Sequence, residues 1–180
     1  MPEPAFLIFR NFDASSFWKN SEYALREYVG RPLTQAMIDH AESKLGYKLP
    51  ASFLELLKTQ NGGIPKNTCH GTQIPTSWAK DHVALHGIHG LDDEKPYSLC
   101  GRISSRFMIE EWGYPDIGIY FGDCPSAGHD MICLDYSKCG NSGEPHVVHV
   151  DQELDYVTTF VAENFEQFIR GLRPDDDFPL

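Results

Sequence analysis

The pattern of apolar and polar positions predicts two helices joined by a short turn within residues 34–60. Thr34 can cap the first helix, and Gly46 can end it in the left-handed conformation. Between these two residues the apolar side chains recur at helical spacing: Met37, Ile38, Ala41 and Leu45. Pro50 suits the first position of the second helix, because its missing N–H would have no partner there. The second helix should stop near Gln60, so the pair forms an αα-hairpin.

The C-terminal half shows a two-residue alternation instead. The alternating sets are Ile117, Ile119 and Phe121, then Ile132, Leu134 and Tyr136, then Val148 and Val150. Three short strands separated by loops rich in Gly, Pro and Ser predict an antiparallel meander. Val83 and Leu85 indicate a further strand upstream.

Helices are expected on both sides of this meander. A helix over 14–29 follows a short apolar stretch at 5–9, which we expect to be a peripheral strand or an extended arm. Ser104 or Ser105 can cap a short helix before the meander. A closing helix is predicted over 155–171, because its apolar residues keep helical spacing. They are Val157, Phe160, Val161, Phe165, Phe168, Ile169 and Leu172.

The order of these elements defines the fold class. Helices come first, strands follow and a helix closes the chain, which is the order of an α+β fold. We expect an antiparallel sheet of about four to six strands packed with helices, with an N-terminal αα-hairpin and a C-terminal helix. The acidic tail at 173–180 is expected to be loose.

The length and the net charge of the chain limit the kinds of partner that it can bind. With 180 residues and a formal net charge of −11, the chain suits one compact acidic domain. Duplex nucleic acid is an unsuitable partner, because neutralising phosphates needs clustered Lys and Arg, and the sequence has no basic block. An acidic protein is suited instead to a basic partner, because complementary charge speeds their encounter.

No segment of the sequence predicts membrane insertion or export. No apolar run approaches the roughly 20 residues that span a bilayer. The start of the chain lacks both a basic region and a small-residue cleavage site. We therefore expect a cytoplasmic protein, in which the five widely spread cysteines are free thiols.

The paired glycines after the second helix raise the question of a phosphate-binding loop. Gly62 and Gly63 follow a helix rather than precede one, so no helix N-terminus faces them. Phosphate loops of the GxxxxGK[ST] and GxGxxG types lie between a strand and a helix, which is not the context here. The glycines are expected to turn the backbone.

Histidines and cysteines in the middle of the chain are the candidate metal ligands. His82, His86 and His89 fall in one short stretch, and the further candidates are Cys124, His129, Cys133 and Cys139. No CxxC pair or HExxH motif gives them tight ligand spacing, so neither a metal nor a cofactor is expected. No catalytic residue is predicted either, because the chain lacks GxSxG and its carboxylates show no paired spacing.

Residues 34–63 combine motifs that resemble a known family. A helix with Ala41-Glu42 is followed by Leu45-Gly46, Leu49-Pro50, a second helix and Asn61-Gly62-Gly63. This combination resembles the signature of the SUKH superfamily, which includes fungal glucan-synthesis regulators and many bacterial immunity proteins. Ala51-Ser52 stand where that family more often has Asp or another polar residue. The resemblance covers 34–172 and leaves 1–33 as an N-terminal extension with a helix and 173–180 as an acidic tail.

The resemblance implies a non-enzymatic domain that binds proteins. Bacterial members are thought to neutralise a toxin, often a nuclease or deaminase, and fungal members act in cell-wall signalling through protein contacts. A nuclease needs a basic cleft to hold phosphates, and an acidic inhibitor can occupy that cleft. We therefore expect an immunity protein whose partner is a basic toxin domain, with no contact to nucleic acid or membrane. The alternatives are a regulatory scaffold without a toxin, and a metal-dependent hydrolase that uses the His- and Cys-rich middle.

The partner-binding face is expected in the acidic loops, with aromatic residues as anchors, because Trp and Tyr are frequent at interface hot spots. The candidate residues are Asp92, Asp93, Glu94, Trp112, Tyr114, Asp116, Asp123 and Asp130, with Trp78 as a further aromatic.

Overall fold

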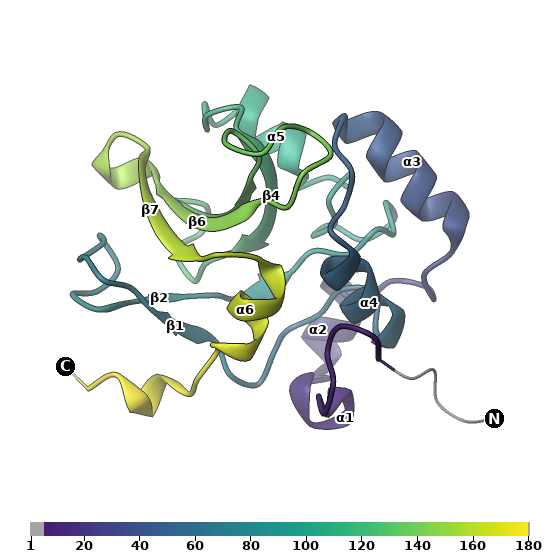
Figure 1. Ribbon diagram of the computed structural model, residues 1–180, viewed down its shortest axis with the longest axis horizontal. Coiled ribbons are helices and arrows are strands. Elements are labelled where there is room, and N and C mark those ends of the chain that lie inside the picture. Colours follow the sequence, from purple (N-terminus) through teal and green to yellow (C-terminus); the bar gives the residue numbers. More distant parts are fainter. Residues whose placement is uncertain (1–5, 180) are drawn as a thin grey trace.

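The main feature of the protein is a five-stranded antiparallel sheet, seen in a computed structural model that describes residues 6–179 (Figure 1). Its strands are β3 (Gly87–Ile88), β4 (Gly118–Asp123), β5 (Asp130–Asp135), β6 (His146–Asp151) and β7 (Val157–Ala162). Neighbours in the sheet are neighbours in sequence, so the sheet is a meander. A separate two-stranded sheet pairs β1 (Cys69–Gly71) with β2 (His82–Ala84). The predicted α+β class and antiparallel sheet are confirmed.

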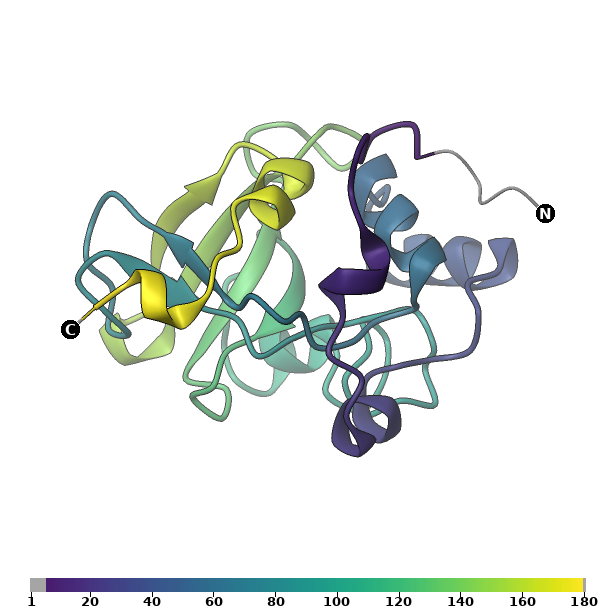
Figure 2. The same cartoon turned by 90° about the horizontal axis from the view of Figure 1, so that it is seen from below.

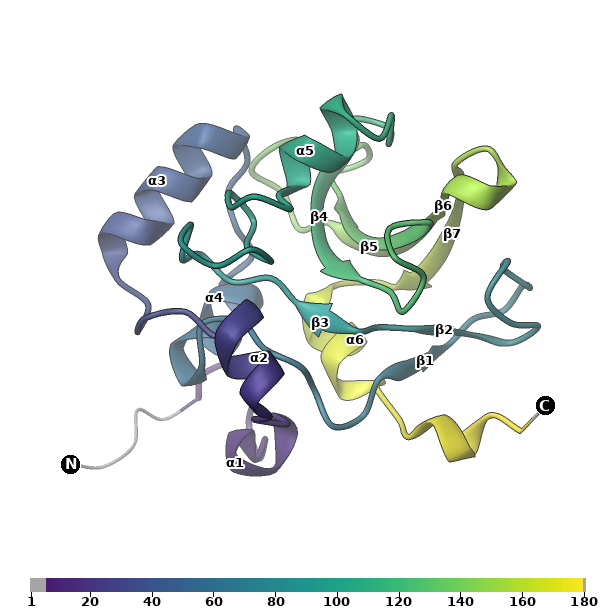
Figure 3. The ribbon, with the colours of Figure 1, turned by 180° about the vertical axis from the view of Figure 1, so that it is seen from behind.

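Helices cover both faces of the main sheet (Figures 1 and 3). The α-helices are α1 (Ala14–Phe17), α2 (Glu22–Glu27), α3 (Gln35–Leu45), α4 (Ala51–Thr59), α5 (Ser105–Glu110) and α6 (Phe165–Arg170). On one face, Phe121 packs against Phe53 of α4 and Phe165 of α6. On the other face, Tyr120 and its neighbours form a second apolar cluster with Met108 of α5. Because both faces are covered, the central strands are buried along most of their length.

The αα-hairpin forms where the sequence predicts it. Thr34 caps α3 by accepting a hydrogen bond from the Met37 N–H, and Gly46 ends the helix with a φ of 80°. Pro50 differs slightly from the prediction, because it is the N-cap residue of α4 and the helix begins at Ala51.

The predicted helix over 14–29 is wrong, since two short helices replace it. Trp18 is extended and forms a β-bridge with Pro65, which interrupts the helix. Ser21 then caps α2 by accepting a hydrogen bond from the Ala24 N–H. Burying Trp18 against α4 therefore outweighs the helical pattern around it.

The predicted closing helix over 155–171 is also wrong in its first half. Residues 157–162 form β7, the edge strand of the sheet, and α6 begins only at Phe165. The segment 157–161 is rich in β-branched side chains, which favour strands. Asn164 separates the two elements, because its side chain accepts a hydrogen bond from the Gln167 N–H and caps α6.

Both ends of the described chain are held against the domain (Figure 2). The strand or arm expected at 5–9 begins outside the described residues, and from Phe6 onward the segment is irregular. The Glu55 carboxylate of α4 accepts hydrogen bonds from the N–H groups of residues 7–9. The tail is not loose: it forms the 3₁₀ helix η2 (Asp175–Asp177), and Phe178 is buried beside Cys69.

Among residues 6–179, none of the helices combines the length and apolar character that crossing a membrane requires. All five cysteines lie in this part of the chain and are free thiols.

Candidate functional site

The Asn61-Gly62-Gly63 turn after α4 joins three segments. The Asn61 side chain is buried, donates to the Arg31 carbonyl and accepts from the Leu91 N–H, both at 2.8 Å. Gly62 has a φ of 89°, and a Cβ there would lie 2.8 Å from the Tyr28 carbonyl oxygen. Only glycine fits this conformation and this close approach. The turn brings backbone segments together, which is the role that the sequence predicts.

Asp92 is buried under the N-terminal segment. Its carboxylate accepts two hydrogen bonds from the Arg31 guanidinium, at 2.9 and 2.8 Å, and one from the Arg31 backbone N–H at 2.9 Å. The Arg31 hydrogen bonds hold the pKa of Asp92 well below its usual range. Asp92 therefore fastens the loop after β3 to the N-terminal segment.

Asp123, at the end of β4, is the centre of a second internal cluster. The Tyr28 hydroxyl donates to it at 2.8 Å, and His86 Nδ1 and His89 Nε2 lie 3.1 and 3.0 Å from its oxygens. Burial alone would raise the pKa of Asp123, but the hydrogen bonds from His86, His89 and Tyr28 outweigh it and lower the pKa to about 2. In return, the hydrogen bond to Asp123 raises the pKa of His86, whose side chain is 37% exposed.

Asp130 forms a third internal cluster at the start of β5. Its Oδ2 lies 2.6 Å from His149 Nε2, and both side chains are buried. Cys124 follows β4 directly, and its Sγ lies within 4.8 Å of ligand atoms of Asp130 and His149. Asp151 of β6 is the cross-strand partner of Asp130 and is buried as well. Burial, together with the charge of Asp130, raises the pKa of the Cys124 thiol well above its ordinary value.

Four of the residues expected at a partner-binding face thus make internal contacts. Tyr114 joins the three aspartates in this respect, since it is 2% exposed and donates a hydrogen bond to the Gly128 carbonyl at 2.7 Å. The four are Asp92, Asp123, Asp130 and Tyr114, and each is at most 8% exposed.

The remaining candidates lie at the surface in separate places. Asp93 and Glu94 are in the loop after β3, where the Asp93 carboxylate lies 2.9 Å from His40 of α3. Trp112 and Asp116 lie between α5 and β4, with Trp112 half-buried and Asp116 exposed. Trp78 is exposed in the β1–β2 loop. The structure therefore does not gather the predicted set into one face.

Trp112 has acidic neighbours that sequence reasoning missed. The Tyr156 hydroxyl donates to the Trp112 carbonyl, and the His129 ring packs edge-on against Trp112 at 6.0 Å. His129 Nδ1 lies 2.7 Å from Glu153, which belongs to the 3₁₀ helix η1 (Gln152–Leu154). These contacts bring η1 beside the end of α5. The two segments that these contacts join carry four exposed acidic residues, Glu110, Glu111, Glu153 and Asp155, and together with Trp112 we call them the α5–η1 surface.

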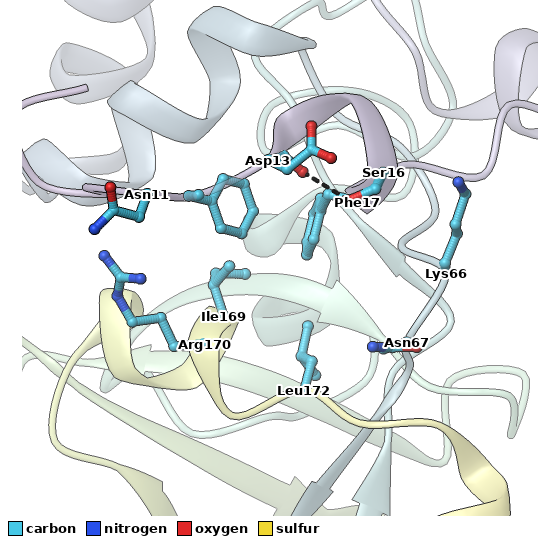
Figure 4. Close-up of a pocket in the computed structure, with 10 residues that line it drawn as sticks. Asn11, Asp13, Ser16, Phe17, Lys66, Asn67, Ile169, Arg170 and Leu172 are labelled. Carbon is cyan, nitrogen blue, oxygen red and sulfur yellow. Dashed lines mark hydrogen bonds between the residues drawn. The ribbon is translucent and has the colours of Figure 1, made fainter. Parts of the chain in front are cut away.

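A groove of about 400 Å³ lies between the N-terminal segment and α6 (Figure 4). Phe17 points toward Ile169 and Leu172 across it, and Arg170 lies near Asn11. The lining residues are Asn11, Phe12, Asp13, Ser16, Phe17, Lys66, Asn67, Ile169, Arg170 and Leu172. Its walls come from three stretches that are far apart in sequence, so no local motif marks it.

Comparison with known proteins agrees with this architecture. The SUKH_6 family model, described as SMI1-KNR4 cell-wall, matches residues 35–169. A comparison with curated proteins gives no match. The matched stretch contains the αα-hairpin, the glycine turn and all five strands of the main sheet. Because the match covers most of the chain, the protein belongs to the SUKH superfamily.

Proposed function

We propose that the protein is an immunity-type domain, which binds a toxin with a basic surface and neutralises it without turnover. Membership of the SUKH superfamily supports action through protein contacts. The formal net charge of −11 supports a basic partner, because complementary charge raises the rate of encounter.

The α5–η1 surface is the observation that carries this proposal. It consists of two contacting segments that carry four exposed carboxylates and a half-buried tryptophan. Tryptophan is a frequent interface anchor, because it buries a large area on binding, and the surrounding charges orient the partner. Arg106 lies 2.9 Å from Glu110 and 3.7 Å from Asp116, so it offsets part of the negative charge. Asp93, Glu94 and Asp116 remain as further contacts in the proposal.

The proposal predicts a toxin gene next to this one, and binding of its product, measured by calorimetry at several salt concentrations, tests the proposal. The double charge reversal Glu111→Lys with Asp155→Lys should weaken binding about tenfold or more and flatten the salt dependence. Trp112→Ala should weaken it by a hot-spot amount, about 2 kcal/mol.

The matched control is Glu22→Lys with Asp39→Lys, which makes the same charge change at exposed positions of α2 and α3. Binding by the control should stay close to that of the unaltered protein. If both pairs weaken binding equally, net charge rather than the α5–η1 surface is responsible. A complex that ignores ionic strength would contradict the electrostatic part of the proposal.

The description of the matched family model, SMI1-KNR4 cell-wall, supports a second candidate function. The protein would then be a regulatory scaffold of the same fold that has no toxin partner. Failure to protect cells from the neighbouring toxin, together with stable binding to a cell-wall regulator, would favour this candidate. Turnover of a small substrate that is lost in His86→Ala would contradict both binding functions and favour a hydrolase.

A further inference from the structure

We propose that Cys124, Asp130 and His149 form a binding site for one zinc ion at one end of the main sheet. The proposal is independent of toxin binding, because the site lies inside the fold. It departs from the expectation that no metal binds, which rested on the absence of closely spaced ligands in the sequence.

The three ligands come from neighbouring strands that the sheet aligns. Cys124 directly follows β4, Asp130 begins β5, and His149 lies in β6. One ligand atom from each lies within 4.8 Å of the others, and all three residues are buried. A zinc ion binds such atoms at about 2.0–2.3 Å, so small side-chain movements bring them into a coordination sphere.

Buried groups without partners mark this place as incomplete. Asp130 Oδ1 and Asp151 Oδ1 have no hydrogen-bond partner among the described residues, and neither does His149 Nδ1. Asp130 and Asp151 are cross-strand neighbours, each at most 2% exposed. The groups facing them are His149, Cys124 and the Ser77 N–H, which donates to Asp151 Oδ2 at 3.0 Å. Buried carboxylates are normally paired with a positive group or bind a metal, so a divalent cation would complete this cluster.

A thiol, an imidazole and a carboxylate together favour zinc over calcium or magnesium. Thiolate sulfur and imidazole nitrogen suit zinc, whereas calcium and magnesium require oxygen ligands. Three protein ligands leave a fourth position for a water molecule, and the unpaired Asp151 Oδ1 can accept its hydrogen bond. Three protein ligands and a water molecule are typical of catalytic zinc, but burial of all three ligands keeps a substrate away, so the ion would stabilise the fold.

Zinc binding includes the release of one proton. Without metal the Cys124 thiol keeps its proton, because burial and the neighbouring carboxylates disfavour the thiolate. The Zn–S bond forms as this proton passes to the buffer, and the charge of the ion stabilises the thiolate. The proton in the hydrogen bond between His149 Nε2 and Asp130 Oδ2 must also leave this position, to His149 Nδ1 or to the buffer, because a metal-bound imidazole nitrogen carries no proton. The β1–β2 loop, which Ser77 ties to Asp151, would open for the ion to enter.

Metal analysis of the full chain tests the proposal. Protein purified without chelator is assayed for zinc, then stripped with EDTA and titrated with zinc chloride or cobalt chloride. We expect one zinc per chain, and with cobalt the near-ultraviolet absorption of a thiolate–cobalt bond. Cys124→Ser should abolish that absorption, and both Cys124→Ser and His149→Gln should weaken zinc binding at least about tenfold.

Cys69→Ser is the matched control, because Cys69, His82 and Asp175 form the other grouping of such side chains in the described residues. This variant should bind zinc like the unaltered protein, and circular dichroism should confirm that every variant is folded. The proposal is overturned if the unaltered protein binds neither metal at a severalfold molar excess, since the cluster is then completed by buried water. It is also overturned if Cys69→Ser, and not Cys124→Ser, loses the metal.

Discussion

The Asp123 and Asp130 clusters share a buried carboxylate in contact with a buried histidine, but the two carboxylates differ in how many of their oxygens have partners. Each is a buried carboxylate at the end of a central strand, with a buried histidine in contact. Each histidine also has an Nδ1 without a partner, so the difference lies in the carboxylates. Both oxygens of Asp123 have partners, whereas Asp130 Oδ1 and the nearby Asp151 Oδ1 have none.

This difference separates two roles for a buried carboxylate. The protein alone stabilises the Asp123 carboxylate. Tyr28, His86 and His89 contact its oxygens and replace the hydrogen bonds to water that burial removes. Asp130 and Asp151 place two carboxylates in one buried place, and the described side chains leave acceptors unused. In the first cluster the protein supplies a partner to both carboxylate oxygens, and we call it the closed cluster. In the second cluster two carboxylate oxygens remain available to a bound ion.

The largest expected effect comes from removing the charge of the closed cluster. Asp123→Asn should lower the free energy of unfolding by about 3 kcal/mol or more, because it leaves buried donors without a charged acceptor. Asp130→Asn should cost less than about 1.5 kcal/mol in metal-free protein, because it also relieves the repulsion with Asp151. Urea unfolding in EDTA measures both values, and equal losses would contradict the comparison.

Adding zinc should act on the second cluster alone. At a free concentration of 100 times the dissociation constant, zinc should add about 2.7 kcal/mol to the free energy of unfolding. The increment should persist in Asp123→Asn and disappear in Cys124→Ser. Thermal unfolding with and without zinc provides the measurement, and an increment that survives in Cys124→Ser would place the metal elsewhere.

Tyr28→Phe tests one hydrogen bond of the closed cluster. Removing the hydroxyl should lower the free energy of unfolding by about 1.5–2 kcal/mol, since the bond is made to a charged group. It should also raise the pKa of Asp123, which the hydroxyl helps to hold at about 2. In a double-mutant cycle, Tyr28→Phe should cost little once Asp123 is Asn, whereas additive losses would show that the hydroxyl acts otherwise.

The smallest expected effect is a pH dependence through His86. Asp123 raises the pKa of His86 above 6.5, so the folded state favours the protonated form. The resulting stability is fully present below pH 6.5 and is lost as the pH rises through the raised pKa. Because the His86 side chain is 37% exposed, solvent screening limits the gain to less than about 1 kcal/mol. His86→Gln should flatten the stability profile between about pH 5 and pH 9, and an unchanged profile would assign the dependence to another group.

Local sequence signals predict the helical hairpin well and the last third of the chain less well. Helix α3 matches its prediction at both ends, because Thr34 and Gly46 act through neighbouring backbone groups. Residues 157–171 carry apolar side chains at helical spacing, yet residues 157–162 form β7. Residues 157–162 form a strand because they pair with β6. This pairing joins separate segments of the chain, so the spacing of apolar residues within one segment does not reveal it.

The internal clusters escape prediction for a similar reason. Tyr28, His86 and Asp123 lie far apart in sequence, and only the sheet and the N-terminal segment bring them together. Acidic residues in polar loops therefore resemble surface groups in the sequence, although Asp92, Asp123 and Asp130 are buried. The segment of Glu153 and Asp155 is far from Trp112 in sequence, and only in the folded chain do the contacts of Tyr156 and His129 bring it to the end of α5.

The N-terminal extension supplies partners that the family domain cannot supply itself. Three buried polar side chains depend on it: Asn61 through the Arg31 carbonyl, Asp92 through the Arg31 guanidinium, and Asp123 through the Tyr28 hydroxyl. A chain shortened to begin at Thr34 would leave all three with unmet hydrogen-bonding capacity in the interior. We therefore expect a chain that begins at Thr34 to be less stable than one that begins upstream of Tyr28, although both contain the whole stretch recognisable as SUKH.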